Sequence, residues 1–83
     1  MNTYTRQFQV VCPNNGLHVS YVLSIQTDRV IPVEAIVSAT EAIGMGYHED
    51  VADELHARFG GHQRLVAHHH GVDIETIRDA AAG

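Results

Sequence analysis

The clearest pattern in the chain is the alternation of apolar and polar residues over 17–26. The apolar side chains of this segment fall on one face: Leu17, Val19, Tyr21, Leu23 and Ile25. Such alternation predicts a strand with one buried face. An earlier segment, 6–12, places Phe8, Val10 and Cys12 on one face of another strand, and the PNNG that follows has turn chemistry. The two segments are therefore expected to pair as a hairpin.

Two segments with helical spacing come next. Pro32 suits the first turn of a helix, and an apolar stripe follows it at Val33, Ile36, Val37, Thr40 and Ile43. The GMG at 44–46 ends this helix. A second helix is expected from near His48 to Gly60-Gly61, with its buried stripe at Val51, Leu55 and Phe59.

Two short strands, 63–69 and 72–78, are expected to close the chain, joined by a tight turn at His70-Gly71. The tail 79–83 is expected to fray. The order is therefore strand, strand, helix, helix, strand, strand. It predicts one α+β domain over 1–83, in which a four-stranded antiparallel sheet carries two helices on one face.

The small size of the chain suggests that it assembles with copies of itself. At 83 residues it buries a modest fraction of its surface, and its single cysteine allows no internal disulfide. An open sheet has two unpaired edges, which invite pairing with another chain. We expect a homo-oligomer formed through these edges, and several sheets joined in this way would close a barrel.

Composition excludes several classes of protein. The formal net charge of −5 provides no basic patch for nucleic acid. No apolar run approaches the roughly 20 residues needed to cross a membrane. The starting segment MNTYTRQFQ is polar and does not resemble a signal peptide. Together with the single thiol, this predicts a cytoplasmic protein.

Four segments, in this order, resemble the tunnelling-fold (T-fold) superfamily: FQVVCP (8–13), IPVE (31–34), GYHED (46–50) and HHHGVDIETIR (68–78). The T-fold includes pterin- and purine-handling enzymes whose sheets assemble into oligomeric barrels, with sites between subunits. Within it, the chain is most similar to 7-cyano-7-deazaguanine nitrile reductases and the related nitrile amidinotransferases. The resemblance implies a small planar heterocycle as ligand, and a nucleophilic cysteine that forms a thioimide with a nitrile.

The chain also departs from that family at three places. The family's proton-donating aspartate, seven positions after the cysteine, is replaced by Val19. The lysine-containing stretch that helps bind NADPH is replaced by AIVSATEA (35–42), which disfavours that cofactor. HHHG replaces an arginine and paired glycines in the second hairpin. Asp28, Glu49 and Asp50 remain as possible substitutes for the missing acid.

The GYHED segment has two interpretations. By resemblance, Glu49 and His48 hold the base: a carboxylate can accept two parallel N–H bonds from a guanine-like or pterin-like edge, His48 bonds a ring carbonyl, and Tyr47 stacks on the ring. Alternatively, Glu49 is a first-turn acid at the positive end of a helix dipole, and Tyr47 packs against the helix.

The other candidate residues also have two interpretations each. Cys12 is either the nucleophile, with His18 as the nearest base, or an inert buried thiol. Glu34 is either a ligand anchor, by resemblance, or an acid in the first turn of a helix. His68 and His70 share a strand face and are weak candidates for two zinc ligands, with His62, His18 or a neighbouring subunit as the third; the other interpretation is a wet, polar hairpin end.

Two functions remain in view from the sequence. The first is a heterocycle-binding T-fold protein that acts on the nitrile of 7-cyano-7-deazaguanine, as a reductase or an amidinotransferase. The second is a non-catalytic interaction or ligand-sequestering protein on the same scaffold, such as a regulator or a phage-type inhibitor.

Overall fold

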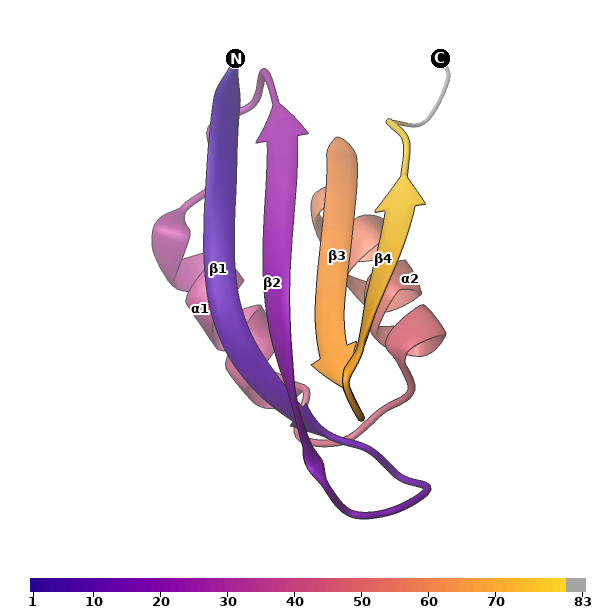
Figure 1. Cartoon of the computed structure of the whole chain (residues 1–83). Coiled ribbons are helices and arrows are strands. Elements are labelled where there is room, and N and C mark those ends of the chain that lie inside the picture. Colours follow the sequence, from indigo (N-terminus) through magenta and orange to yellow (C-terminus); the bar gives the residue numbers. More distant parts are fainter. Residues whose placement is uncertain (81–83) are drawn as a thin grey trace.

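The computed structural model describes residues 1–80. The chain runs in the order β1 (Asn2–Val11), β2 (His18–Thr27), α1 (Val33–Ala42), α2 (His48–Phe59), β3 (His62–His69) and β4 (Val72–Arg78) (Figure 1). These bounds confirm the predicted elements and their order, although β1 begins four residues earlier than the 6–12 segment. The tail 79–83 was expected to fray, and its residues 81–83 lie outside the described range.

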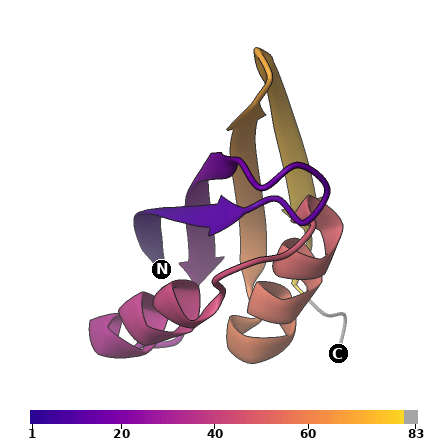
Figure 2. The same ribbon diagram turned by 90° about the horizontal axis from the view of Figure 1, so that it is seen from below.

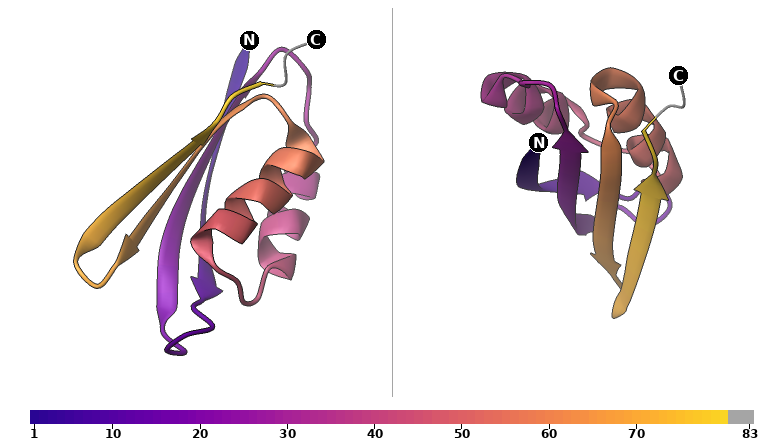
Figure 3. Two further views of the ribbon diagram at one scale, coloured as in Figure 1. Left: turned by 90° about the vertical axis from the view of Figure 1, so that its right-hand side faces the viewer. Right: turned by 90° about the horizontal axis from the view of Figure 1, so that it is seen from above.

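The four strands form one antiparallel sheet in the order β1-β2-β3-β4, and both helices lie on the same face of it (Figures 2 and 3). This confirms the α+β layer. We call the helix-covered face the inner face and the opposite one the outer face. None of the helices in residues 1–80 has the length and apolar character needed to traverse a bilayer.

The hydrophobic core fills the space between the inner face and the helices. Alternation along β2 places Val19, Tyr21, Leu23 and Ile25 in this core, as predicted. The stripe of α2, which consists of Val51, Leu55 and Phe59, packs there as well. Because every strand alternates, the side chains between these positions form the outer face, which is mostly polar but also carries Val22 and Ile77, 37% and 51% exposed.

Two apolar residues that the pattern assigned to buried faces are exposed. Leu17 is 49% exposed, because strand pairing begins only at Val11 opposite His18 and leaves Leu17 in the loop. Val33 is 60% exposed, and Ile31, just before α1, supplies the buried aliphatic side chain at that end instead. Periodicity therefore located the elements correctly but failed at their first residues.

The two hairpin loops meet at one end of the sheet, which we call the hairpin end. His70 and Gly71 both have positive φ, 52° and 78°, so they form the predicted tight turn between β3 and β4. The loop between β1 and β2 lies beside it, since Asn15 Nδ2 donates to His70 Nε2 at 3.1 Å. The tip of the β3–β4 hairpin bends away from the helices (Figure 2), which leaves the inner face open near this tip.

Candidate functional site

A small pocket opens on the inner face at the hairpin end. Its volume is about 190 Å³. Strands β2, β3 and β4 form one side of it, and the segment that leads into α2 forms the other. The lining residues are Cys12, Val19, Tyr21, Gly46, Tyr47, His48, Ala67, His69 and Ile74. Three predicted site residues, Cys12, Tyr47 and His48, are therefore brought together here.

Cys12 is placed at the pocket by the turn that ends β1. Its N–H donates to the Leu17 carbonyl at 2.9 Å, and its own carbonyl accepts the Gly16 N–H at 2.9 Å. The residue is half-buried and packs against the core, with its thiol free. The segment from Gly44 to Gly46 is drawn to β1 by two further bonds, from Val11 N–H to Gly44 O (3.0 Å) and from Gly46 N–H to Val11 O (3.2 Å). These bonds bring α2 and its first residue next to the cysteine.

His48 carries the fully buried polar atoms of the pocket that have no hydrogen-bond partner in the part of the chain that the structure describes. Both of its ring nitrogens are buried, and neither has a hydrogen-bond partner within residues 1–80. Burial lowers the pKa of His48; the Glu49 charge opposes this shift and Arg78 adds to it. The imidazole is therefore neutral at pH 7, with one N–H donor and one acceptor nitrogen. Native proteins rarely leave such groups unsatisfied, so a water molecule, a ligand or a partner chain is their expected partner.

Aromatic rings form one wall beneath His48. The rings of Phe8 and Tyr21 stack with centroids 5.3 Å apart, and the His48 ring lies tilted over Tyr21 at 5.4 Å. The phenol of Tyr47 stands at the pocket and is 54% exposed. Tyr21 was predicted only as a core residue, and alternation did correctly place it on the same face as Val19. Its role as a pocket wall depends on the register between strands, which the alternation does not contain.

Glu49 lies outside the pocket, on the exposed side of the first turn of α2. Its carboxylate accepts a hydrogen bond from Arg78 Nη2 at 2.7 Å, and Arg78 Nε also donates to Asp53 at 3.1 Å. Arg78 thus joins α2 to the edge strand β4. These contacts agree with the interpretation of Glu49 as an acid in the first turn of a helix. Glu49 could anchor a ligand only if a second copy of the chain formed part of the binding site.

The remaining predicted site residues are not brought to the pocket. His18 is exposed and alternates with the inward-facing Val19, so it points to the outer face, away from Cys12. Glu34 lies exposed in the first turn of α1. His48 and His69, and not His18, are the imidazoles that line the pocket with Cys12.

The histidines of the second hairpin have separate partners. His68 Nδ1 donates to Asp73 at 2.7 Å, whereas the His70 ring packs edge-on against His69 at 4.3 Å. Among residues 1–80, no group of three His, Cys, Asp or Glu side chains is arranged to hold a metal ion. Of these three histidines, His69 is the one that lines the pocket, together with His48; the alternation had placed it on the face opposite to His68 and His70.

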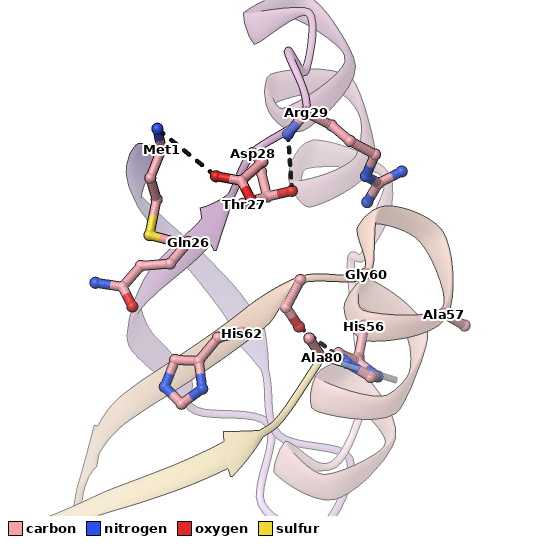
Figure 4. Close-up of a pocket in the computed structure, with 11 residues that line it drawn as sticks. Met1, Gln26, Thr27, Asp28, Arg29, His56, Ala57, Gly60, His62 and Ala80 are labelled. Carbon is pink, nitrogen blue, oxygen red and sulfur yellow. Dashed lines mark hydrogen bonds and ion pairs between the residues drawn. The ribbon is translucent and has the colours of Figure 1, made fainter. Parts of the chain in front are cut away.

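A larger cavity of about 720 Å³ lies at the opposite end of the sheet (Figure 4). Its titratable side chains already have partners within the chain. Arg29 donates to the carbonyl of Phe59 at the end of α2, and His56 and His62 donate to the Asp79 backbone oxygen and carboxylate, both at 2.9 Å. Because these groups are engaged, the smaller pocket with the unpartnered His48 is the better candidate for a ligand site.

Comparison with known proteins leaves the chain without an assigned family: no family model matches it, and no match is found among curated proteins or solved structures.

Proposed function

We propose that the protein binds a small planar heterocycle of the purine or pterin type in the pocket between Cys12 and His48. The observation that carries this proposal is the pair of buried ring nitrogens of His48, which lack partners within residues 1–80. A neutral imidazole offers one N–H donor and one acceptor nitrogen, and either of them can bond to a group on the edge of such a ring. The phenol of Tyr47, which is 54% exposed, is suited to stacking on such a ring.

The size of the pocket supports a bare ring as ligand. Sites for drug-sized molecules usually enclose about 300–1,000 Å³, whereas this pocket has about 190 Å³. It is mostly apolar, with Val19, Ala67 and Ile74 beside the few polar groups. A heterocycle without sugar or phosphate fits this description better than a whole nucleotide.

We further propose that copies of the chain complete this site. Strands β1 and β4 are the two edges of the sheet, and Ile74 of β4 lines the pocket, so the pocket lies at an open edge. A T-fold-like barrel, formed by joining edges of several copies, would cover it. Glu49 faces outward next to His48 and would then meet the ring or a neighbouring copy at the subunit boundary. The single free cysteine is consistent with the cytoplasm as the site of action.

The catalytic version of the proposal has Cys12 attack the nitrile of 7-cyano-7-deazaguanine to form a thioimide. The presence of this thiol and an unpartnered imidazole in one pocket supports it. Reduction of the thioimide would require NADPH, and the chain contains no lysine for the cofactor's phosphates. Transfer of an amine to the thioimide carbon needs no nicotinamide, so the amidinotransferase version is preferred.

A non-catalytic, ligand-sequestering protein is the second candidate, and the pocket lining favours it in one respect. None of the nine lining residues carries a carboxylate or a permanently charged cation. A site without these groups can hold a ring by stacking and hydrogen bonding while doing no chemistry. A regulator or a phage-type inhibitor built on the same scaffold would need only this.

Substitution of His48 tests ring binding. In a Cys12→Ala background, which restricts the experiment to reversible binding, we expect His48→Phe to weaken binding of 7-cyano-7-deazaguanine at least about tenfold. The substitution keeps a planar ring but removes hydrogen bonds to buried groups, which are worth about 1–3 kcal/mol. Titration calorimetry measures the affinity, and His18→Phe, on the outer face, is the control. Equal affinity of the two variants would contradict the proposal, as would the absence of any binding.

Substitution of Glu49 tests the anchor at the subunit boundary. We expect Glu49→Gln to abolish ring binding, because an amide replaces one of the two acceptor oxygens by a donor. Asp53→Asn is a matched control, since Asp53 shares Arg78 with Glu49 but lies one helical turn farther from His48. Both variants weaken the contact between α2 and β4, so loss of binding in only the first identifies the carboxylate as an anchor. Equal affinities in both would retire Glu49 from that role.

A further inference from the structure

The hydroxyl of Tyr21 is a further polar group of the pocket. The side chain is 3% exposed and lines the pocket with Cys12. Its ring contacts the rings of Phe8 and His48. The hydroxyl takes part in no hydrogen bond among residues 1–80, in contrast to the Tyr4 hydroxyl, which accepts the Ile31 N–H at 3.0 Å. Unlike the two ring nitrogens of His48, this oxygen is not among the fully buried polar atoms without a partner, so it can donate its proton to a ligand in the pocket.

The chemistry of a thioimide requires such a donor. When a thiolate adds to a nitrile, negative charge develops on the nitrogen, and a positioned acid lowers the barrier by protonating it. None of the three candidate carboxyl groups for proton donation lines the pocket. Asp28 is at the opposite end of the sheet, near the amino group of Met1. Glu49 is bound to Arg78, and Asp50 is exposed on α2.

We propose that Tyr21 is the proton donor to the nitrile nitrogen, an inference that rests on the catalytic version of the proposed function. In this step, His48 accepts the proton of the Cys12 thiol, and the thiolate sulfur bonds to the nitrile carbon. One π pair of the C≡N bond moves to nitrogen, which takes the proton of the Tyr21 hydroxyl. The imidazolium of His48 then returns a proton to the phenolate. The sum is addition of the thiol S–H across the nitrile, with no redox partner required.

The electrostatic environment keeps the acid and the base in the forms that this step needs. Burial raises the pKa of Tyr21, and negative charge on Cys12 raises it further, so the phenol is protonated at neutral pH. Burial lowers the pKa of His48, so its imidazole is free to accept a proton. The stacked rings fix the order of the groups: Tyr21 lies against His48, and both face the pocket that Cys12 lines.

A comparison of Tyr21→Phe with the unmodified protein tests whether Tyr21 is the proton donor. The substitution removes one oxygen atom and keeps the aromatic ring that contacts Phe8 and His48, so the fold is retained. Urea unfolding verifies this. Mass spectrometry follows the growth of the covalent adduct at several concentrations of 7-cyano-7-deazaguanine, which separates the rate constant at saturation from the affinity. We expect the rate constant to fall by about a hundredfold with little change in affinity. Tyr4→Phe, which removes a phenol outside the pocket, is expected to retain the original rate constant.

Three results would overturn the assignment of Tyr21 as proton donor. An adduct that forms at the original rate in Tyr21→Phe and disappears in Cys12→Ala overturns the role of Tyr21 alone. A rate lost equally in Tyr21→Phe and Tyr4→Phe assigns the effect to the loss of any phenol in the fold and also overturns it. Absence of any adduct in the unmodified protein overturns both this inference and the catalytic version of the proposed function, whereas ring binding would survive as a separate result.

Discussion

Incubation of the protein with 7-cyano-7-deazaguanine is expected to raise its mass by one whole nitrile molecule per chain, and Cys12→Ala is expected to remain unmodified. The complete molecule is retained because addition of a thiol to a nitrile releases no leaving group. Cys12 is the only cysteine of the chain, so the effect of its substitution is all or none. Intact-mass spectrometry under non-reducing conditions measures both proteins.

A matched control separates the pocket from the rest of the surface. His18 begins β2 just after the turn that holds Cys12, but it points to the outer face, so His18→Ala should form the adduct at the original rate. Loss of the adduct in this variant would restore His18 as the base and contradict the role given to His48. Protein that binds the ring without gaining mass would instead support the sequestering function. A chain that does neither is best explained as an interaction protein.

The fold could be predicted from the sequence because each element carries its own period. Alternation over 17–26 and the spacing of Val51, Leu55 and Phe59 each report one buried face, and turn residues separate the segments. The order of elements then leaves few arrangements for a sheet and two helices. The exceptions, Leu17 and Val33, stand at the beginnings of elements, where a residue can satisfy the period without lying under the opposite layer.

The composition of the pocket could be predicted only in part. The resemblance pointed to Cys12, Tyr47 and His48, which the structure brings to one pocket, and to Glu34 and Glu49, which do not line it. Cys12 and His48 line the same pocket because the backbone of Val11 forms hydrogen bonds with the glycine segment before α2. That contact joins distant parts of the chain and leaves no periodic signal. Tyr21 and His69 become pocket residues through the pairing of β2, β3 and β4, which is equally absent from local patterns.

The second large effect is expected at the opposite end of the sheet, where Gly61 turns the chain from α2 into β3. Gly61 has φ +72°, and a Cβ built on it would lie 2.6 Å from the backbone oxygen of Gln26. Gln26 is opposite His62 in the first rung between β2 and β3, so the clash involves backbone that side-chain rotation cannot relieve. We expect Gly61→Ala to lower the free energy of unfolding by about 2–4 kcal/mol, measured by urea denaturation.

Gly71→Ala is the matched control for this prediction. Gly71 has φ +78°, nearly the same as Gly61, but a Cβ at this position would have no atom within 4 Å. Its substitution therefore costs only the strain of a left-handed alanine, about 1 kcal/mol. The difference between the two variants isolates the steric contact with Gln26, and equal losses would show that backbone conformation alone matters. Because Gly61 lies far from the Cys12–His48 pocket, the folded fraction of Gly61→Ala should bind the ring with unchanged affinity, which separates the stability of the scaffold from the chemistry at its hairpin end.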